Sequence, residues 1–289
     1  METFTVKAFG TSAVDQDLNQ MEIKRRVTTA TDIEIEILYC GVCHSDLHTA
    51  RNDWGFTTYP AIPGHEIVGK VTKIGNEVTK LKVGDVAAVG CLVGSCGTCD
   101  SCKQDLEQYC ANGWVGTYNS PDKHLGGMTY GGYSQKVVVD QHFVLKVPSN
   151  LDLAATAPLL CAGITTWSPL RHWNVTKGTK VAVVGLGGLG HMAIKLAKGL
   201  GADVTLFSRS PGKEKDAKDL GADAVIISTD ENQMNTVAGK FDIIIDTVPY
   251  VHDINPYVNT LNISGTIVLV GYLGGLEPIL NTVPMIMGR

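Results

Sequence analysis

The chain of 289 residues has no long hydrophobic run and no block of like charge. One of its long uncharged windows, residues 153–170, is interrupted by Pro158, Gly163 and Pro169, which argues against a membrane span. The 24 basic and 29 acidic residues are dispersed and give a net charge of −5, so no basic footprint for nucleic acid is present. The first residues lack the basic start and apolar core of a secretory signal, so we expect a cytoplasmic protein that binds neither membrane nor nucleic acid.

The length exceeds what a single hydrophobic core usually supports, so two domains are expected. In residues 1–150, alternation of apolar and polar residues predicts strands at 33–39 and 67–75. Further β-rich segments lie at 86–89 and 135–139, between turns rich in Gly, Pro and Asp. This pattern predicts a small barrel-like or sandwich-like β domain.

Residues 151–289 show a different pattern, in which short apolar runs alternate with helical segments. The first run, residues 179–184, is followed by helical spacing over residues 191–200. Further strand-like runs lie at residues 204–207, 224–227, 241–245 and 266–270. Repeated strand and helix units predict an α/β domain with a doubly wound parallel sheet.

A glycine-rich turn separates the first predicted strand of this domain from its helix. A lone G-x-G-x-x-G motif is weak, but between a strand and a helix it allows a tight turn and close approach of the backbone to a pyrophosphate. The candidate cofactor-binding residues of the turn are Gly185, Gly187, Gly188, Leu189 and Gly190.

The second strand indicates which dinucleotide binds. An acidic residue at its end would bind the ribose hydroxyls of NAD, but this chain has Ser208, Arg209 and Lys213 there. Asp203 precedes the apolar run and so belongs to the opposite end of the sheet. A hydroxyl, a guanidinium and an ammonium group suit a 2′-phosphate, which favours NADP(H); an ordinary solvated basic loop is the alternative.

Four of the eight cysteines fall within fifteen residues, in the spacing C-x2-C-x2-C-x7-C. They are Cys96, Cys99, Cys102 and Cys110. Four thiolates this close can surround a tetrahedral ion with a single loop, which predicts a structural zinc site. An iron–sulfur cluster and a metal-free group of thiols are the alternatives, although the fourth cysteine is distant for a ferredoxin and no proline follows it. Cys40 and Cys91 fit no spacing and are expected to be small buried residues.

A second group of metal donors lies earlier in the chain. The six residues from Cys43 to His48 include a thiol, two imidazoles, a hydroxyl and a carboxylate, and His65 and Glu66 follow shortly after. Soft and borderline donors of this kind suit a transition metal. A polar surface loop is the alternative.

Together these motifs resemble the zinc-dependent medium-chain alcohol dehydrogenases, in the branch of cinnamyl alcohol dehydrogenases and bacterial NADPH-dependent aldehyde reductases. The resemblance rests on residues 41–48, 64–66, 128–134 and 161–166, together with the cysteine lobe and the glycine turn. It implies a GroES-like catalytic domain followed by a Rossmann domain. It also implies a homodimer, and because family members continue beyond residue 289, the sheet is expected to lack its last strand.

The resemblance assigns metal ligands. The catalytic zinc would be held by Cys43, His65 and Cys161, with Glu66 as an alternative ligand and Asp46 orienting the His65 ring. The second zinc would fill the four-cysteine lobe, which gives two zinc ions per chain.

The resemblance also assigns roles in catalysis. Zinc would polarise the carbonyl while the nicotinamide transfers a hydride, and Ser45 would pass a proton through the cofactor ribose to His48. A simple surface histidine is the alternative for His48. His44 would contact the pyrophosphate and Thr165 the nicotinamide.

The expected function is therefore a zinc-dependent oxidoreductase that interconverts primary alcohols and aldehydes with NADP(H). Trp54 and Trp114 are candidates for an aromatic substrate wall or for domain core. The competing interpretations are a polyol dehydrogenase of the same superfamily and a catalytically silent, truncated dinucleotide-binding protein.

Overall fold

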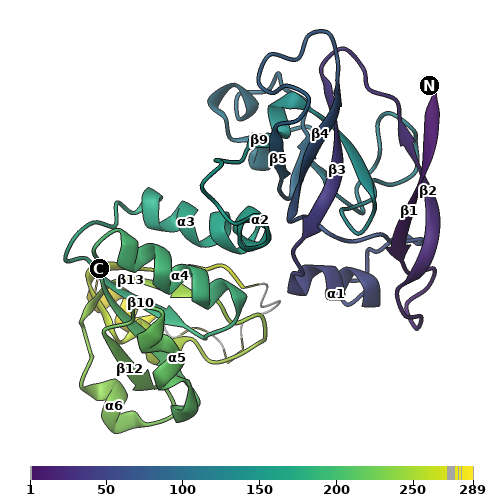
Figure 1. Cartoon of the computed structure of the whole chain (residues 1–289). Helices are drawn as coiled ribbons and strands as arrows, with labels where there is room; N and C mark the ends of the chain where they lie inside the picture. The colour runs from purple at the N-terminus through teal and green to yellow at the C-terminus, as the bar shows by residue number, and fades with distance from the viewer. Residues whose placement is uncertain (1, 272–276, 279, 281, 289) are drawn as a thin grey trace. The chain divides into compact units, whose positions relative to one another are not determined.

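The computed structural model describes residues 2–271, 277–278, 280 and 282–288. Its contacts divide the chain into two compact units, Met1–Cys161 and Ala162–Arg289. Figure 1 shows a first unit rich in strands and a second unit in which helices and strands alternate.

The division between the units falls eleven residues later than the boundary after residue 150 that the sequence indicates. The intervening helices, α2 (Leu153–Thr156) and η4 (Ala157–Leu160), belong to the first unit. They do so because Leu160 and its neighbours pack in a buried cluster with Val68 and Ala88 of the first unit's sheet.

The first unit contains a five-stranded antiparallel sheet with the order β8-β3-β4-β5-β9. Its strands are β3 (Asp32–Cys40), β4 (Ile67–Ile74), β5 (Val86–Val89), β8 (Lys136–Asp140) and β9 (Leu145–Lys146). The two strands predicted from alternation and the two further β-rich segments all lie in this sheet. Inward-facing residues such as Ile33, Ile35 and Val71 form its buried core, because successive side chains of a strand alternate between its faces.

Two smaller sheets complete the strands of the first unit. In one, β1 (Thr3–Gly10) pairs with β2 (Asn19–Arg26), and in the other β6 (Leu92–Gly94) pairs with β7 (Val115–Gly116). The short helices are α1 (His44–Arg51), η1 (Cys102–Gln104), η2 (Glu107–Tyr109) and η3 (Gln141–Phe143), in addition to α2 and η4. The helix α1 and the two small sheets were not predicted from the sequence.

The second unit has five parallel strands in the order β12-β11-β10-β13-β14. They are β10 (Lys180–Val184), β11 (Asp203–Ser208), β12 (Ala224–Ile227), β13 (Phe241–Asp246) and β14 (Leu261–Leu269). The helices are α3 (Ala162–His172), α4 (Gly188–Gly199), η5 (Pro211–Lys213), α5 (Glu214–Asp219), α6 (Glu231–Asn235), α7 (Asn255–Val258) and α8 (Val283–Gly288). The doubly wound parallel sheet is therefore confirmed.

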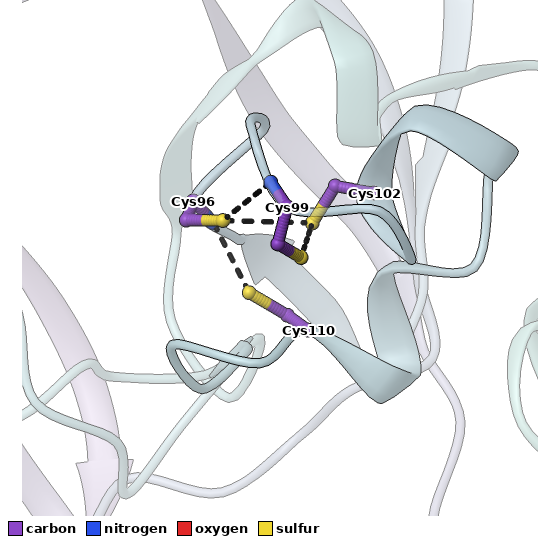
Figure 2. Close-up of side chains that lie close together, drawn as sticks. All are labelled: Cys96, Cys99, Cys102 and Cys110. Carbon is purple, nitrogen blue, oxygen red and sulfur yellow. Dashed lines mark hydrogen bonds between the residues drawn. The ribbon is translucent and has the colours of Figure 1, made fainter.

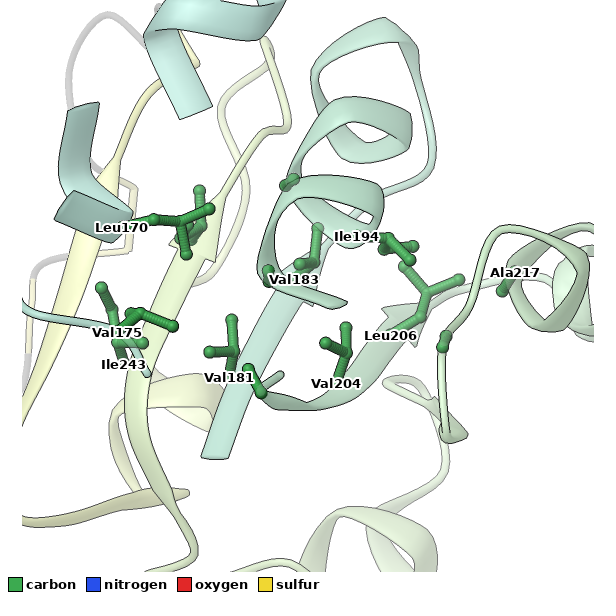
Figure 3. Packing of buried hydrophobic residues seen from close by; sticks show 14 residues of the cluster. Leu170, Val175, Val181, Val183, Ile194, Val204, Leu206, Ala217 and Ile243 are labelled. Atoms are coloured by element: carbon green, nitrogen blue, oxygen red, sulfur yellow. The ribbon is translucent and has the colours of Figure 1, made fainter. Parts of the chain in front are cut away.

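Both faces of this sheet are buried, and adjacent residues of one strand supply opposite faces. Val181 and Val183 belong to a cluster with Ile194 of α4 (Figure 3). Ala182 and Val184 belong to another cluster, on the side where the loops and helices after β12 and β13 pack. A strand buried on both sides reads as a continuous apolar run, which is why the sequence predicts these strands well.

The order of the strands defines where this unit can bind a ligand. The chain runs from β10 to β11 and β12 on one side, then crosses to β13 and β14 on the other side of β10. In open α/β sheets, ligands bind outside the carboxyl ends of the strands at this reversal. For this chain, the carboxyl ends of β10 and β13 mark the position.

Among the described residues no single helix is long and apolar enough to cross a membrane. One bent pair, Leu153–Leu160 with Ala162–His172, meets the criteria of length and composition when taken together.

Candidate metal centres and dinucleotide site

The four cysteines of the first unit's lobe converge on one point. Their sulfur atoms all lie within 4.8 Å of one another. Figure 2 shows the four side chains pointing toward one another. The Sγ atom of Cys102 is 3.4 Å from that of Cys99 and 3.9 Å from that of Cys96. Four sulfurs at this spacing can surround one tetrahedral ion.

Backbone N–H groups point at these sulfurs, which is the arrangement that thiolates favour. The N–H groups of Thr98 and Cys99 donate to the Cys96 sulfur, at 3.5 and 3.4 Å. These bonds, with that of Thr98 the largest influence, lower the pKa of Cys96 to about 5. The Cys99 sulfur accepts from the N–H of Ala111, and the Cys110 sulfur from that of Cys96. The donor set therefore fits a zinc ion with four thiolate ligands.

A second donor group gathers side chains from three separate segments of the first unit. The donor atoms of Cys43, His65, Glu66 and Cys161 all lie within 4.8 Å of one another. The sulfurs of Cys43 and Cys161 are 3.8 Å apart although the residues are 118 positions apart in sequence. The neighbouring Cys161 thiol and then burial raise the pKa of Cys43. A divalent cation between the two sulfurs would favour the thiolate form of both.

The short helix α1 fixes the position of Cys43. Cys43 is the residue that caps the start of the helix, and its N–H donates to the Asp46 carboxylate at 2.9 Å. The other carboxylate oxygen of Asp46 accepts from the N–H of Gly64, at 2.9 Å. Asp46 therefore ties the segment that carries Cys43 to the segment that carries His65. Asp46 holds the backbone next to His65 through Gly64, and its negative charge raises the pKa of His65.

The imidazole of His65 stacks on an aromatic ring of the same unit. The rings of His65 and Tyr118 are nearly parallel, with their centroids 5.3 Å apart and an angle of 7° between planes. The buried Nε2 atom of His65 has no hydrogen-bond partner among the described residues. A buried polar atom without a partner is costly, and a metal ion is a partner that the two nearby thiols and the carboxylate would share. The site therefore fits zinc.

A second carboxylate lies beside this cluster under tight steric limits. Glu66 is 2% exposed, and a β-carbon at Gly41 would lie 2.0 Å from its Oε2 atom. Only glycine at position 41 leaves the carboxylate in place. Glu66 is therefore held among the donor atoms of Cys43, His65 and Cys161.

A buried arginine supports the wall behind His65. The Arg25 guanidinium donates to the carbonyl oxygens of Tyr130, Gly131 and Lys136 at 2.7 to 2.9 Å. The N–H of Gly131 donates to the Ile62 carbonyl, which precedes the His65 turn. Burial lowers the pKa of Arg25 to about 10, and its donors replace the lost water. Arg25 thus fixes the strand-like segment against which the His65 turn packs.

The residues expected to move a proton lie on α1. The Oγ atom of Ser45 is 3.6 Å from the Cys43 sulfur. His48 lies one turn further along, and its Nδ1 atom is 2.8 Å from a carboxylate oxygen of Asp53. A carboxylate accepts a hydrogen bond, so Nδ1 carries a hydrogen and Nε2 is left as the acceptor of neutral His48.

Aromatic rings continue from this histidine. The His48 ring stacks on His44 at 5.0 Å between centroids, and the centroid of the Trp54 ring lies 5.2 Å from that of His48. The structure therefore places Trp54 beside the expected proton-transfer residues. Trp114 is 49% exposed and follows the four-cysteine lobe along the chain.

The two remaining cysteines are half-buried rather than fully buried as expected. A β-carbon at Gly64 would lie 2.8 Å from the Cys40 sulfur, and burial raises the pKa of Cys40 to about 12. The Cys91 sulfur lies 3.9 Å from the Leu160 carbonyl oxygen. Neither cysteine is part of a metal-binding group among the described residues.

In the second unit, the glycine turn joins β10 to α4 and has the geometry that the motif requires. Gly185 has a φ of +87°, which favours glycine. A β-carbon at Gly190 would lie 2.2 Å from the Gly185 carbonyl oxygen, so the third glycine allows the helix to pack closely on the strand. Gly187 and Gly188 have open space around them, and Leu189 is half-buried. The turn can therefore admit an anion at the start of α4.

The three polar residues expected to select the dinucleotide lie at the carboxyl end of β11. Ser208 ends the strand, and its hydroxyl exchanges hydrogen bonds with the backbone of Ser210. Arg209 and Lys213 are exposed, and the Lys213 ammonium lies 3.8 Å from Asp216. Asp203 begins the strand and so lies at its other end. Thr165, on α3, is half-buried in the same unit.

Several residues that shape these sites were missed by sequence reasoning. They are Arg25, Asp53, Tyr118 and Tyr133, whose hydroxyl donates to Asp46 at 3.0 Å. Only Tyr133 carried a signal, because it lies in the segment 128–134 that resembles the family. The others act through contacts that no local spacing reveals.

Comparisons with known proteins agree with this geometry. Family models match residues 29–149, as an alcohol dehydrogenase GroES-like domain, and residues 188–289, as a zinc-binding dehydrogenase. Cinnamyl alcohol dehydrogenase 2 from Rauvolfia serpentina is 53% identical over 270 residues, which cover 92% of this chain and 74% of that protein.

NADP-dependent alcohol dehydrogenase C 1 from Mycolicibacterium smegmatis is 50% identical over 268 residues, covering 92% of this chain and 76% of that protein. The crystal structure of CAD from Helicobacter pylori complexed with NADP(H) matches with a TM-score of 0.92 and 40% identity. The match covers 100% of this chain and 82% of that structure. The chain therefore belongs to the zinc-dependent medium-chain alcohol dehydrogenases, in the branch that includes the cinnamyl alcohol dehydrogenases.

Proposed function

We propose that this chain interconverts primary alcohols and aldehydes by hydride transfer with NADP(H), and that aromatic or medium-length aliphatic compounds are its substrates. The observation that carries the proposal is the convergence of Cys43, His65 and Cys161 from three distant segments. A structural metal site has all its positions filled by protein, whereas three ligands leave one position for a substrate oxygen.

These three residues would hold the zinc ion, and Glu66, within reach, would be an alternative to a substrate oxygen in the fourth position. When bound there, zinc supplies Lewis-acid chemistry to an oxygen of the substrate. The residues of the chain then have to move one proton for each hydride. Ser45 lies beside the ligand Cys43, and its hydroxyl can both accept and donate a proton.

His48 is suited to receive that proton. Its Nδ1 hydrogen is engaged by Asp53, so Nε2 is free of its own hydrogen in the neutral ring. No hydrogen bond joins Ser45 to His48 among the described residues, so the path requires an intervening hydroxyl. Asp53 then stabilises the imidazolium that forms, as a carboxylate does behind a histidine base.

The cofactor assignment is supported by the second unit. The open glycine turn provides N–H groups for a pyrophosphate, and the end of β11 carries Ser208, Arg209 and Lys213 instead of a carboxylate. A relative that is 50% identical is an NADP-dependent enzyme, and the matched Helicobacter pylori structure contains NADP(H). NADP(H) is therefore the proposed dinucleotide.

The test combines metal analysis with turnover. Two zinc ions per chain together with NADPH-linked reduction of cinnamaldehyde or benzaldehyde would support the proposal. One zinc ion and no turnover would indicate a silent dinucleotide-binding protein. Two zinc ions with a strong preference for mannitol over cinnamyl alcohol would indicate a polyol dehydrogenase instead.

A further inference from the structure

A buried acid and a histidine form a pair at the carboxyl end of β13. Asp246, the last residue of the strand, has a fully buried side chain, and the His252 side chain is 19% exposed. The Nε2 atom of His252 lies 2.9 Å from a carboxylate oxygen of Asp246. Its Nδ1 atom lies 2.8 Å from the carbonyl oxygen of Tyr250. Both ring nitrogens therefore face oxygen atoms.

These contacts fix the number of protons in the pair. The carbonyl oxygen of Tyr250 can only accept, so Nδ1 carries a hydrogen. In a neutral ring, Nε2 would then be an acceptor that faces an acceptor of ionised Asp246. The contact of 2.9 Å therefore requires one more proton, either on Nε2 or on the carboxyl group. Without that proton the ring has one hydrogen for two oxygen contacts, so either the contact to Asp246 or the contact to Tyr250 is lost.

The protonated pair holds the loop that follows β13 in place. The second carboxylate oxygen of Asp246 accepts from the N–H of Val248 at 3.1 Å, so the loop is tied to Asp246 near both of its ends. Thr247 donates to the Val184 carbonyl through its N–H at 3.1 Å and its hydroxyl at 2.7 Å. The loop that follows β13 is therefore held directly against the end of β10.

This loop borders the glycine turn. A β-carbon at Gly185 would lie 3.1 Å from a Val248 methyl group and 3.2 Å from the Thr247 hydroxyl. Val184 pairs with Asp246 across the two strands whose ends mark the reversal of strand order. Ligands of such sheets bind at this position, so any shift of the loop alters the wall of the dinucleotide site.

We propose that Asp246 and His252 form a proton-dependent latch, in which His252 acts as a positioning residue that shapes the loop 247–251 for NADP(H). The inference rests on the proposed function, because it takes NADP(H) as the ligand of the glycine turn. The latch is closed when the pair holds its shared proton and opens as the pH rises. NADP(H) affinity should then fall with the loss of this proton.

The surroundings of the pair favour keeping the proton. Burial raises the pKa of Asp246, although the hydrogen bond to Val248 and the positive charge of His252 oppose this. Because the pKa of Asp246 is raised, the stabilisation that the protonated pair contributes is present at low pH. This stabilisation is lost as the pH rises through that pKa. The ring of Tyr257, on α7, faces His252 with the centroids 6.2 Å apart. Burial raises the pKa of Tyr257, and Arg209 and Asp253 are the charged groups near it besides Asp246.

Two substitutions separate the closed latch from the open one. In Asp246→Asn, the amide can donate to Nε2 of neutral His252, so the contact closes without a titrating proton. In His252→Phe, the ring remains but the contact cannot form at any pH. His142→Gln is the matched control, since His142 also contacts a carboxylate, Glu107, at 2.6 Å on the surface of the first unit.

The measurement is NADPH affinity by fluorescence, from about pH 6 to about pH 10, a range above the unperturbed pKa of carboxyl groups and on both sides of neutral. We expect the affinity of the wild-type chain to fall by about tenfold relative to Asp246→Asn as the pH rises, which is the effect of about one hydrogen bond to a charged group. His252→Phe should bind weakly throughout, and His142→Gln should follow the wild type. The 2′-phosphate of NADPH also titrates in this range. Its effect cancels when the affinities of the wild type and a variant are compared at the same pH, because both bind the same ligand.

Equal pH profiles for the wild type and Asp246→Asn would overturn the latch and leave the proposed function intact. A wild type that fails to bind NADPH at every pH would instead overturn the proposed cofactor, and the latch with it. If the variants do not fold, NMR titration of the His252 ring in the wild type is sufficient. Bound NADPH should raise the pH at which the pair loses its proton, by reciprocal linkage, and an unchanged titration would contradict the proposal.

Discussion

The two metal centres of the first unit use similar donors but are built in opposite ways. The four-cysteine lobe draws all its ligands from residues 96–110, and backbone N–H groups surround the sulfurs. The other centre joins Cys43, His65 and Cys161, which depend on the sheet and its connections to meet. The lobe is therefore a local structure, whereas the second centre depends on the fold of the whole unit.

The difference in construction matches a difference in chemistry. Four thiolates complete a tetrahedral coordination sphere and leave nothing for a substrate. The second centre places a buried Nε2 atom, which has no hydrogen-bond partner within the described part of the chain, next to two thiols and holds Ser45 at its edge. The local centre is suited to stabilise structure, and the assembled centre is suited to catalyse a reaction.

The strongest test of this contrast removes one ligand from the assembled centre. Cys43→Ala should lower turnover by about a thousandfold, because loss of Lewis-acid stabilisation removes about 4 kcal/mol from the barrier reduction. Zinc content should fall from two ions per chain to one, and the thermal transition should change little. Metal analysis and NADPH-linked kinetics give both values.

Cys40→Ala is the matched control for this prediction. Cys40 lies close to Gly64, which precedes the ligand His65, but it contributes no donor to the second centre. It should keep two zinc ions and most of the turnover. If Cys43→Ala kept two zinc ions and normal turnover, Cys43 would not be a ligand of a catalytic metal.

The converse substitution addresses the local centre. Cys102→Ser should remove one zinc ion and lower the free energy of unfolding by about 3 kcal/mol, since the binding energy of a structural metal is folding energy. Turnover per folded chain should remain near that of the wild type at low temperature. Thermal unfolding together with kinetics separates the two effects, and loss of turnover in fully folded protein would contradict the proposed division of roles.

The same contrast explains which parts of the sites could be predicted from residue spacing alone, without the resemblance to a known family. The lobe could be read from spacing alone, because Cys96, Cys99 and Cys102 are neighbours along the chain and remain neighbours in space. The glycine turn was predicted for the same reason. Cys161 has no local signal of this kind, and only resemblance to a family linked it to Cys43 and His65. The contact between these segments is a property of the sheet and its connections.

The domain boundary shows a related limit. The sequence changes character near residue 150, where the last strand of the first unit ends, and this change marked the predicted boundary. The structure assigns Leu160 to the first unit because its side chain packs with Val68 and Val147. The boundary between the units depends on buried contacts between residues that are distant in sequence. The local composition of the sequence gives no information about such contacts.

A smaller effect is expected for the proton path of the assembled centre. Ser45→Ala should lower turnover at least tenfold, a typical contribution of a positioned acid–base group, while both zinc ions remain bound. Ser45→Thr keeps the hydroxyl and should recover part of the rate. Retention of full turnover in Ser45→Ala would exclude this serine from the path.

The smallest predicted effect concerns the stack that orients the histidine of the assembled centre. Tyr118→Leu removes the ring that lies parallel to His65, and such aromatic pairs contribute about 1 kcal/mol, so zinc affinity at this centre should fall by about fivefold. Tyr118→Phe keeps the ring and should retain the affinity, which separates stacking from the effect of the hydroxyl. Cobalt substitution followed by competition with a chelator would measure both variants at this centre, with the four-cysteine lobe as an internal reference that neither change should affect. A lobe that lost metal in parallel would show that Tyr118 stabilises the whole unit, and the independence of the two centres would then be wrong.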